Sequence, residues 1–159
     1  MQFALWKYPI HLLAYGLGTG LSPVAPGTVG TLVGIALYWF MASLSPALYV
    51  GLTAVLFLAG IFICGQTAQD IGAKDPGMIV FDEIVGFLVA MFMLPREWPW
   101  IVAGFLAFRL FDIWKPWPIP AAEQKFGLGT GIMVDDVIAA LYALALLHAA
   151  RLGLERMAT

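Results

Sequence analysis

The chain has little charge for its length. Only 11% of its 159 residues are charged, 62% are hydrophobic and the mean hydropathy is +0.90. Because soluble domains carry about 25% charged residues, this composition excludes an ordinary soluble domain and is typical of a membrane protein. The formal net charge is −2, and no run of Lys or Arg resembles a phosphate-backbone footprint. We therefore expect no nucleic-acid partner.

Cysteine is almost absent as well. Cys64 stands alone inside an apolar run, which excludes an internal disulfide and favours a small buried hydrophobe. The N-terminus lacks the charged start and small-residue cleavage site of a signal peptide. We expect residues 1–27 to be retained as an interfacial segment and a Gly- and Pro-rich loop, with Trp6, Tyr8 and Tyr15 at the interface.

Long apolar runs make up most of the chain. They cover residues 31–44, 47–68, 78–95, 101–114 and 132–152. The alternating strands of a closed barrel are not visible, and in lipid only helices otherwise satisfy every backbone polar group. We predict one all-α domain over residues 1–159, an integral membrane helical bundle with about four to five membrane helices. The first, third and fourth runs are short for a full crossing.

Small residues recur at four-residue spacing on two of these runs. The pairs are Gly30 with Gly34 and Ala139 with Ala143, and we expect close helix contacts at both. No internal repeat and no long linker divides the chain, which agrees with a single domain.

Most of the acidic residues fall near one set of helix ends. Five helices that alternate in direction bring the Gly-rich loop, the ends of the second and fourth helices and the starts of the third and fifth to one side. We therefore predict a polar site at one membrane face. The cations near that face are Lys7, Lys74, Lys115 and Lys125, and those opposite are Arg96, Arg151 and Arg156. This bias weakly favours the cytoplasm for the acidic face.

Two adjacent acid pairs, Asp82-Glu83 and Asp135-Asp136, each open an apolar run. Neighbouring helical side chains diverge by about 100°, so each pair offers one carboxylate inward and one sideways. Helix capping explains a single pair. Two pairs at one face would repel strongly without a cation, and carboxylate oxygens suit Mg²⁺. The further acids at that face are Asp70, Asp75 and Asp112.

The segment RLFDIWKP (109–116) brings three charges close together. Arg109 and Asp112 share a helix face, and Lys115 lies about 120° away from Arg109. One interpretation is a neutralised intramembrane ion pair with Lys115 extended to the interface. The other is a phosphate site, since Arg binds phosphate bidentately and Lys supplies a point charge. The spacing alone leaves both open.

The Gly-rich segment 16–31 lacks the Lys-Ser/Thr ending of a P-loop. Its Pro26-Gly27-Thr28 stretch precedes a helix, where free backbone N–H groups and a hydroxyl could receive an anion. Judged alone, a tight turn with Thr28 as the N-cap is the simpler interpretation.

Several other phosphatase and metal motifs are missing. Neither a D-x-D pair of the haloacid-dehalogenase type nor the histidine motifs of acid-phosphatase-like lipid phosphatases occurs, and no Arg follows Cys64 at phosphate-loop spacing. His11 and His148 have no Cys or His cluster around them. We expect His11 at the interface and His148 at an interface or a helix end.

Four segments carry a family resemblance. They are GLGTGLSPVAPGTVGTL (16–32), DIGAKDPGMIVFDEIVG (70–86), RLFDIWKPWPI (109–119) and GTGIMVDDVIAA (129–140), about a third of the chain. Together and in this order they resemble the signature blocks of the phosphatidylglycerophosphatase A family. The resemblance implies a Mg²⁺-dependent phosphoric monoester hydrolase, multi-pass in the bacterial inner membrane. Such enzymes convert phosphatidylglycerophosphate to phosphatidylglycerol and phosphate.

The resemblance also implies roles for residues. The predicted metal ligands are Asp82, Glu83, Asp135 and Asp136, with Asp70 and Asp75 completing the site. The predicted catalytic residues are Asp82, Glu83, Asp112, Lys115 and Asp136, and the predicted phosphate-binding residues are Thr28, Lys74, Arg109 and Lys115. The expected partners are the phospholipid substrate and the bilayer, with no protein partner implied. Attack by a metal-activated water and an aspartyl-phosphate intermediate both remain open.

Two other functions use similar residues. A small ion- or proton-coupled transporter would use intramembrane carboxylates, but it predicts inverted repeats and charge near the middle of helices. A phospholipid-synthesising phosphotransferase would carry a D-G-x-x-A-R signature, which the sequence lacks.

Overall fold

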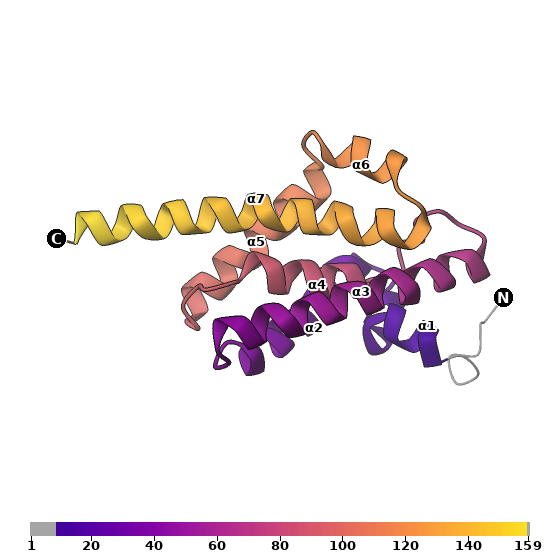
Figure 1. The fold of residues 1–159 in the computed structure, drawn as a ribbon, viewed down its shortest axis with the longest axis horizontal. Helices are drawn as coiled ribbons and strands as arrows, with labels where there is room; N and C mark the ends of the chain where they lie inside the picture. Colours follow the sequence, from indigo (N-terminus) through magenta and orange to yellow (C-terminus); the bar gives the residue numbers. More distant parts are fainter. Residues whose placement is uncertain (1–8, 159) are drawn as a thin grey trace.

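Helices joined by short loops form the whole of the computed structural model, which describes residues 9–158 (Figure 1). No strand occurs among those residues, so the predicted all-α class is confirmed. The elements are α1 (Pro9–Ala14), the 3-10 helix η2 (Gly16–Leu21), α2 (Pro26–Met41), α3 (Pro46–Ile71), α4 (Phe81–Ala90), α5 (Trp98–Trp114), α6 (Ile119–Lys125) and α7 (Leu128–Met157). The expected interfacial positions of Trp6 and Tyr8 lie outside the described residues, and the same expectation for Tyr15 is wrong, because this side chain is buried in the core.

The helix boundaries differ from the apolar runs. Helix α2 begins at Pro26, since proline is well suited to the first position of a helix. Helix α7 begins at Leu128, so its first turn includes part of the Gly-rich stretch. The Gly-rich loop contains η2, and the 115–131 connection contains α6. Helix α4 ends at Ala90 although the third apolar run continues to residue 95. At about 15 Å, α4 is too short to cross a membrane.

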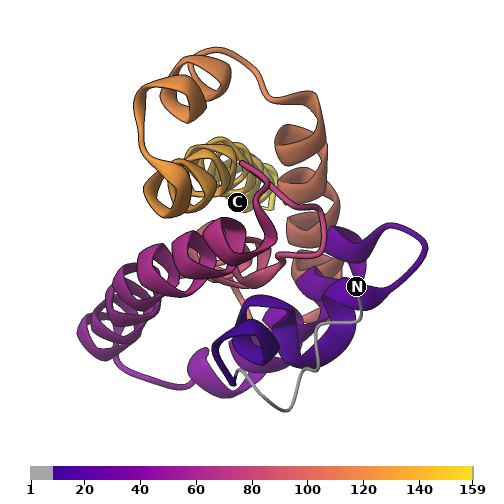
Figure 2. The ribbon, with the colours of Figure 1, turned by 90° about the vertical axis from the view of Figure 1, so that its right-hand side faces the viewer.

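Helix α4 is the centre of the bundle. Eight of its ten residues are buried, and it contacts α2, α3, α5 and α7. Viewed along the long axis, α1 and α2 lie on the opposite side of the bundle from α6 (Figure 2). A helix surrounded in this way has its first turn held on all sides, which matters because that turn carries Asp82 and Glu83.

Side chains from three other parts of the chain donate to backbone carbonyls at and just after the end of α4, most of them buried or partly buried. The donors pair with the carbonyls as Tyr49 with Leu88, His148 with Phe92, Arg151 with Met93 and Tyr38 with Leu94. A buried carbonyl without a partner costs free energy, so these bonds stabilise the break after Ala90. His148 lies inside α7 and not at one of its ends, so the helix-end expectation is wrong, and its ring binds the Phe92 carbonyl just after α4.

Small residues bring the helices of the core close together, as the spacing predicted. A Cβ on Gly30 would lie 2.5 Å from the Val80 Cβ, and one on Gly34 would lie 3.1 Å from the Phe87 Cβ. Ala139 and Ala143 of α7 are fully buried. These contacts leave no room for larger side chains between α2 and α4.

Helices α3 and α7 cross at a second close contact. A Cβ on Gly129 would lie 1.9 Å from the Ile61 carbonyl oxygen, and one on Gly60 would lie 2.6 Å from the Met133 sulfur. The two backbones therefore nearly touch here. Away from this crossing the two helices diverge toward the C-terminal end of α7 (Figure 1).

Two of the described helices, α3 with 26 residues and α7 with 30, are long and apolar enough to cross a membrane, and α2 is a shorter apolar helix. Large apolar side chains such as Phe62, Leu58 and Leu146 are exposed on α3 and α7. Association with a membrane is consistent with these surfaces.

The Tyr49 hydroxyl offers a test of the α4 terminus. Tyr49→Phe removes the donor to the Leu88 carbonyl, a bond of 2.6 Å, and leaves that acceptor buried. We expect a loss of about 1–3 kcal/mol in the free energy of unfolding, measured by denaturation in detergent. Tyr142→Phe is the control, because its acceptor, the Trp117 carbonyl, is exposed. Equal stability of both variants and the wild type would contradict this role.

Candidate functional site

Three carboxylates from two helices meet at the start of α4. Asp82 and Glu83 lie in the first turn of α4, and Asp136 lies in the third turn of α7. Each offers an oxygen that lies within 4.8 Å of the other two. Asp82 and Asp136 are 7% and 3% exposed. The capping interpretation is wrong for Asp136, since the first turn of α7 holds no acid.

This acidic cluster (Asp82, Glu83 and Asp136) has oxygens that no protein group satisfies. Asp82 Oδ1, Glu83 Oε2 and Asp136 Oδ2 are buried without a hydrogen-bond partner among the described residues. Burial raises the pKa of Asp82 well above its usual range, and the charges of Glu83 and Asp136 raise it further. Burial also raises the pKa of Glu83. Buried carboxylates with free oxygens are the ligand set that a hard divalent cation takes.

Two cations border the cluster, one from each end of the RLFDIWKP segment. The Arg109 guanidinium pairs with Asp112 and lies 3.6 Å from the Glu83 carboxylate. The Lys115 ammonium lies 2.7 Å from the Asp135 carboxylate. The five carboxylates on α4, α5 and α7 therefore exceed the two cations by three formal charges when all are ionised. The protein itself does not balance this site.

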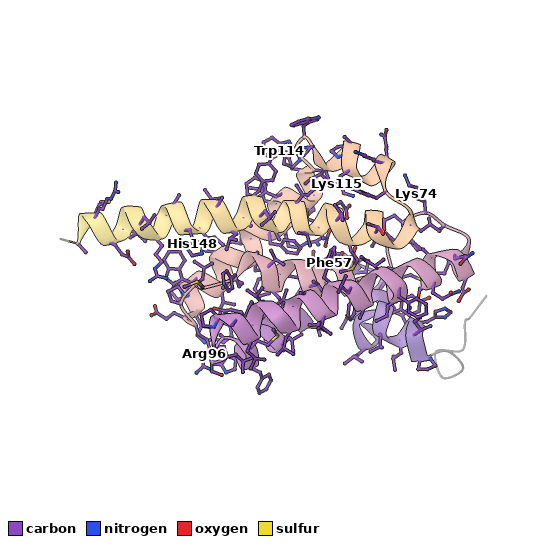
Figure 3. All side chains as sticks on the ribbon, viewed as in Figure 1. Phe57, Lys74, Arg96, Trp114, Lys115 and His148 are labelled. Atoms are coloured by element: carbon purple, nitrogen blue, oxygen red, sulfur yellow. The ribbon has the colours of Figure 1, made fainter. Side chains whose placement is uncertain are left out.

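Lys115 has an unusual backbone conformation. It ends α5 in the left-handed region, with φ 46° and ψ 61°, where glycine is common because a side chain costs about 1–2 kcal/mol. Its ammonium binds the Asp135 carboxylate, and the Lys115 side chain as a whole is 31% exposed. The ion pair with Asp135 disfavours the interpretation in which Lys115 extends to the membrane interface. Figure 3 shows Lys115 and Lys74 toward one end of the bundle and Arg96 and His148 toward the other.

Gly27 is a site residue whose role the sequence did not reveal. A Cβ there would lie 2.1 Å from Glu83 Oε1 and 3.1 Å from both terminal nitrogens of Arg109. Only glycine lets the first turn of α2 lie against this ion pair, and the positive end of the helix dipole favours the carboxylate. The prediction of Thr28 as N-cap is wrong: Ala25 occupies that position, and Thr28 is half-buried in the first turn.

Lys74 and Asp75 lie in the loop between α3 and α4. Both are exposed, and they line a small pocket together with Gly131 and Asp135. The loop therefore borders the site on its α7 side, next to the Lys115–Asp135 pair. This placement is compatible with contact to a bound phosphate.

Asp70 lies apart from the acidic cluster. Its two oxygens accept hydrogen bonds from His11 at 2.9 Å and Gln66 at 2.8 Å. His11 is 2% exposed, so its expected interfacial position is wrong. The reason is that α1 folds back against the end of α3, where Asp70 offers the imidazole a charged partner.

Comparisons with known proteins identify the family of the chain. The family model described as Phosphatidylglycerophosphatase A matches residues 12–151. Phosphatidylglycerophosphatase A of Escherichia coli is 42% identical over 141 residues, 88% of this chain and 82% of that protein. Phosphatidylglycerophosphatase A of Haemophilus influenzae is 46% identical over 143 residues, 89% of this chain and 88% of that protein.

A third relative has another name. The protein called Putative phosphatidylinositol-3-phosphatase in Bacteroides thetaiotaomicron is 37% identical over 148 residues, 88% of this chain and 92% of that protein. No solved structure matches the chain. The family model and the relatives from Escherichia coli and Haemophilus influenzae carry the same enzyme name. The chain belongs to the phosphatidylglycerophosphatase A family and is a phosphatase.

Proposed function

We propose that this protein hydrolyses the terminal phosphate of phosphatidylglycerophosphate in a Mg²⁺-dependent reaction that gives phosphatidylglycerol and phosphate. The observation that carries the proposal is the acidic cluster, whose three buried oxygens lack partners beside two cations. The choice of lipid substrate rests on the membership of the chain in the phosphatidylglycerophosphatase A family. The transporter alternative is not favoured, because charge gathers at one end of the bundle and the family is enzymatic.

The principal metal ligands in the proposal are Asp82, Glu83 and Asp136. Asp135 extends the site, since its Oδ1 accepts the Asp136 backbone N–H at 2.9 Å and its other oxygen binds Lys115. Bound Mg²⁺ would polarise the phosphoryl group and lower the pKa of a water. The remaining acids that we predicted as ligands are Asp75 at the rim of the pocket and Asp70, which is already bonded to His11.

Positive side chains of this chain would bind the phosphate. Arg109 is held in a fixed orientation by Asp112 and Glu83, so its remaining N–H groups can meet phosphate oxygens without much loss of entropy. Lys115, paired with Asp135, supplies a point charge. In the proposal, Lys74, which lines the small pocket, and Thr28, which follows Gly27 in the first turn of α2, complete the phosphate contacts. A carboxylate of the site accepts the proton of the attacking water.

We further propose that the protein is multi-pass in the bacterial inner membrane with the acidic cluster facing the cytoplasm. Helices α3 and α7 are long enough to cross, and α2 and α5, with 16 and 17 residues, reach about 25 Å with modest local thinning of the bilayer. Four helices would then surround the half-length α4. The orientation rests on the excess of Lys near the acidic face.

The metal requirement and the cluster can be tested together. We expect purified protein in detergent to release inorganic phosphate from phosphatidylglycerophosphate with Mg²⁺ and to stop with chelator. Asp82→Asn and Asp136→Asn should each lower kcat by about 10²-fold or more, because each removes a carboxylate ligand from the proposed metal site. Glu155→Gln, at an exposed ion pair on the far end of α7, is the matched control. Chelator-resistant release, or near-normal rates in both Asn variants, would contradict the proposal.

Gly27→Ala tests the position of Glu83 separately from its charge. The new methyl group would displace the flexible Glu83 carboxylate, because it would lie 2.1 Å from Oε1. We expect phosphate release to fall by about tenfold or more with little change in thermal stability. Gly51→Ala on α3 is the control, since no atom lies within 4 Å of its new Cβ. A Gly27→Ala enzyme with wild-type kcat/KM would show that the contact with Glu83 is not needed.

A further inference from the structure

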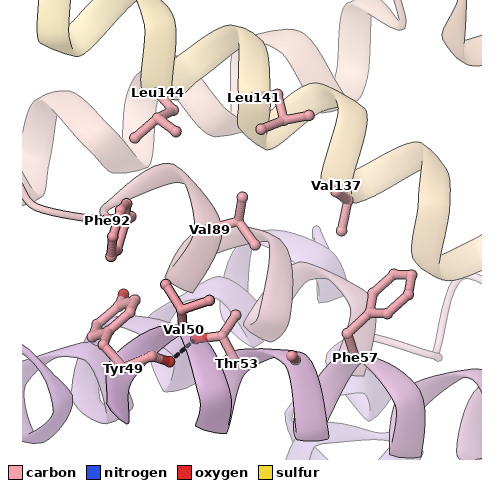
Figure 4. Close-up of a pocket in the computed structure, with 10 residues that line it drawn as sticks. Tyr49, Val50, Thr53, Phe57, Val89, Phe92, Val137, Leu141 and Leu144 are labelled. Atoms are coloured by element: carbon pink, nitrogen blue, oxygen red, sulfur yellow. Dashed lines mark hydrogen bonds between the residues drawn. The ribbon is translucent and has the colours of Figure 1, made fainter. Parts of the chain in front are cut away.

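An apolar groove runs between α3 and α7, with α4 as its floor (Figure 4). Its volume is about 340 Å³, within the range of small-molecule sites. The groove exists because α3 and α7 touch at Gly129 and Ile61 and diverge beyond that point. Phe57 and Val137 face each other at the narrow end, and Tyr49 and Leu144 at the wide end.

The surface of the groove offers no hydrogen-bonding group. Its two polar side chains, Tyr49 and Thr53, both donate to backbone carbonyls. The Tyr49 hydroxyl binds the Leu88 carbonyl at 2.6 Å, and the Thr53 hydroxyl binds the Tyr49 carbonyl at 2.8 Å. All other lining side chains are hydrocarbon or aromatic. The groove is thus suited to an occupant without polar atoms along its length.

The narrow end of the groove lies at the level of Asp136 along α7. Val137, at its narrow end, follows Asp136 directly in α7, and Leu144 lies about 10 Å further along that helix. On α4, Val89 lies seven residues after Asp82 and on the same helix face. Along α4 and α7, the groove therefore extends away from the carboxylates. It lies between α3 and α7, the two described helices that are long and apolar enough to cross a membrane.

We propose that this groove binds an acyl chain of the phospholipid whose phosphate lies at the acidic cluster. The proposal rests on the proposed function, and it assigns the site a lipid substrate with a chain long enough to run from Val137 toward Leu144. A helix from a second copy fits less well, because a helix with its side chains is about 10–12 Å wide and a stable interface buries well over 1,000 Å². A hydrocarbon chain requires neither the width of a helix nor an interface of that area.

Filling the groove should change the preference for chain length. Ala54 lines the groove and is exposed, so Ala54→Phe occupies it without moving the backbone. We expect kcat/KM for long-chain phosphatidylglycerophosphate to fall about tenfold or more, while a water-soluble short-chain analogue is hydrolysed at the wild-type rate. Ala145→Phe, exposed on α7 outside the groove, is the control. An unchanged long-to-short ratio in Ala54→Phe would overturn the proposal.

A binding readout separates this proposal from the proposed activity. Phosphatidylglycerophosphate with a photoreactive group in the middle of one acyl chain should cross-link to residues 49–57 and 137–144 in the wild type and not in Ala54→Phe. Phosphatidylcholine with the same label should cross-link there much less. Equal labelling by both lipids, or cross-links between two copies of the chain, would overturn the acyl-chain site. Specific labelling in a protein that releases no phosphate would overturn the proposed activity alone.

Discussion

The main physical constraint on this structure is the excess of negative charge at the buried acidic cluster. Asp82, Glu83 and Asp136 are close enough to share one cation, and Arg109 and Lys115 offset only part of the charge around them. Carboxylates that are removed from water and left unpaired cost several kcal/mol each. A fold that keeps them together needs bound protons or a bound cation, and this need links stability to function.

The short helix α4 makes the arrangement possible within an apolar bundle. Its first turn places two carboxylates inside the protein, while carbonyls at and just after its end accept hydrogen bonds from side chains of α2, α3 and α7. Gly27 lets α2 begin against Glu83, and the crossing at Gly129 brings α7 with Asp136 to the same depth. The same crossing makes α3 and α7 diverge, which opens the apolar groove below the site. One set of close backbone contacts thus accounts for both the polar and the apolar part of the proposed lipid site.

Much of this could be predicted from local patterns, because local patterns determine helices. The all-α class, the close contacts at Gly30 and Gly34 and the buried Cys64 follow from hydrophobicity and residue size. The meeting of the acid pairs follows from alternating helix direction. The end of α4, the Gly27 contact, the His11–Asp70 pair and the groove depend on residues far apart in the chain, for which a single sequence carries little signal. Lys115 ends α5 in the left-handed conformation, and its ion pair with Asp135 likewise joins residues far apart in the chain.

The central claim is that the acidic cluster holds a divalent cation, and direct metal binding tests it without any substrate. Mn²⁺ titrated into the purified protein can be followed by electron paramagnetic resonance, with Mg²⁺ as the competitor. We expect saturable Mn²⁺ binding that Mg²⁺ displaces and that Asp136→Asn greatly weakens, because Asp136 supplies one of three convergent oxygens. Binding of equal strength in the wild type and in Asp136→Asn, or no binding to folded wild-type protein at millimolar metal, would contradict the account.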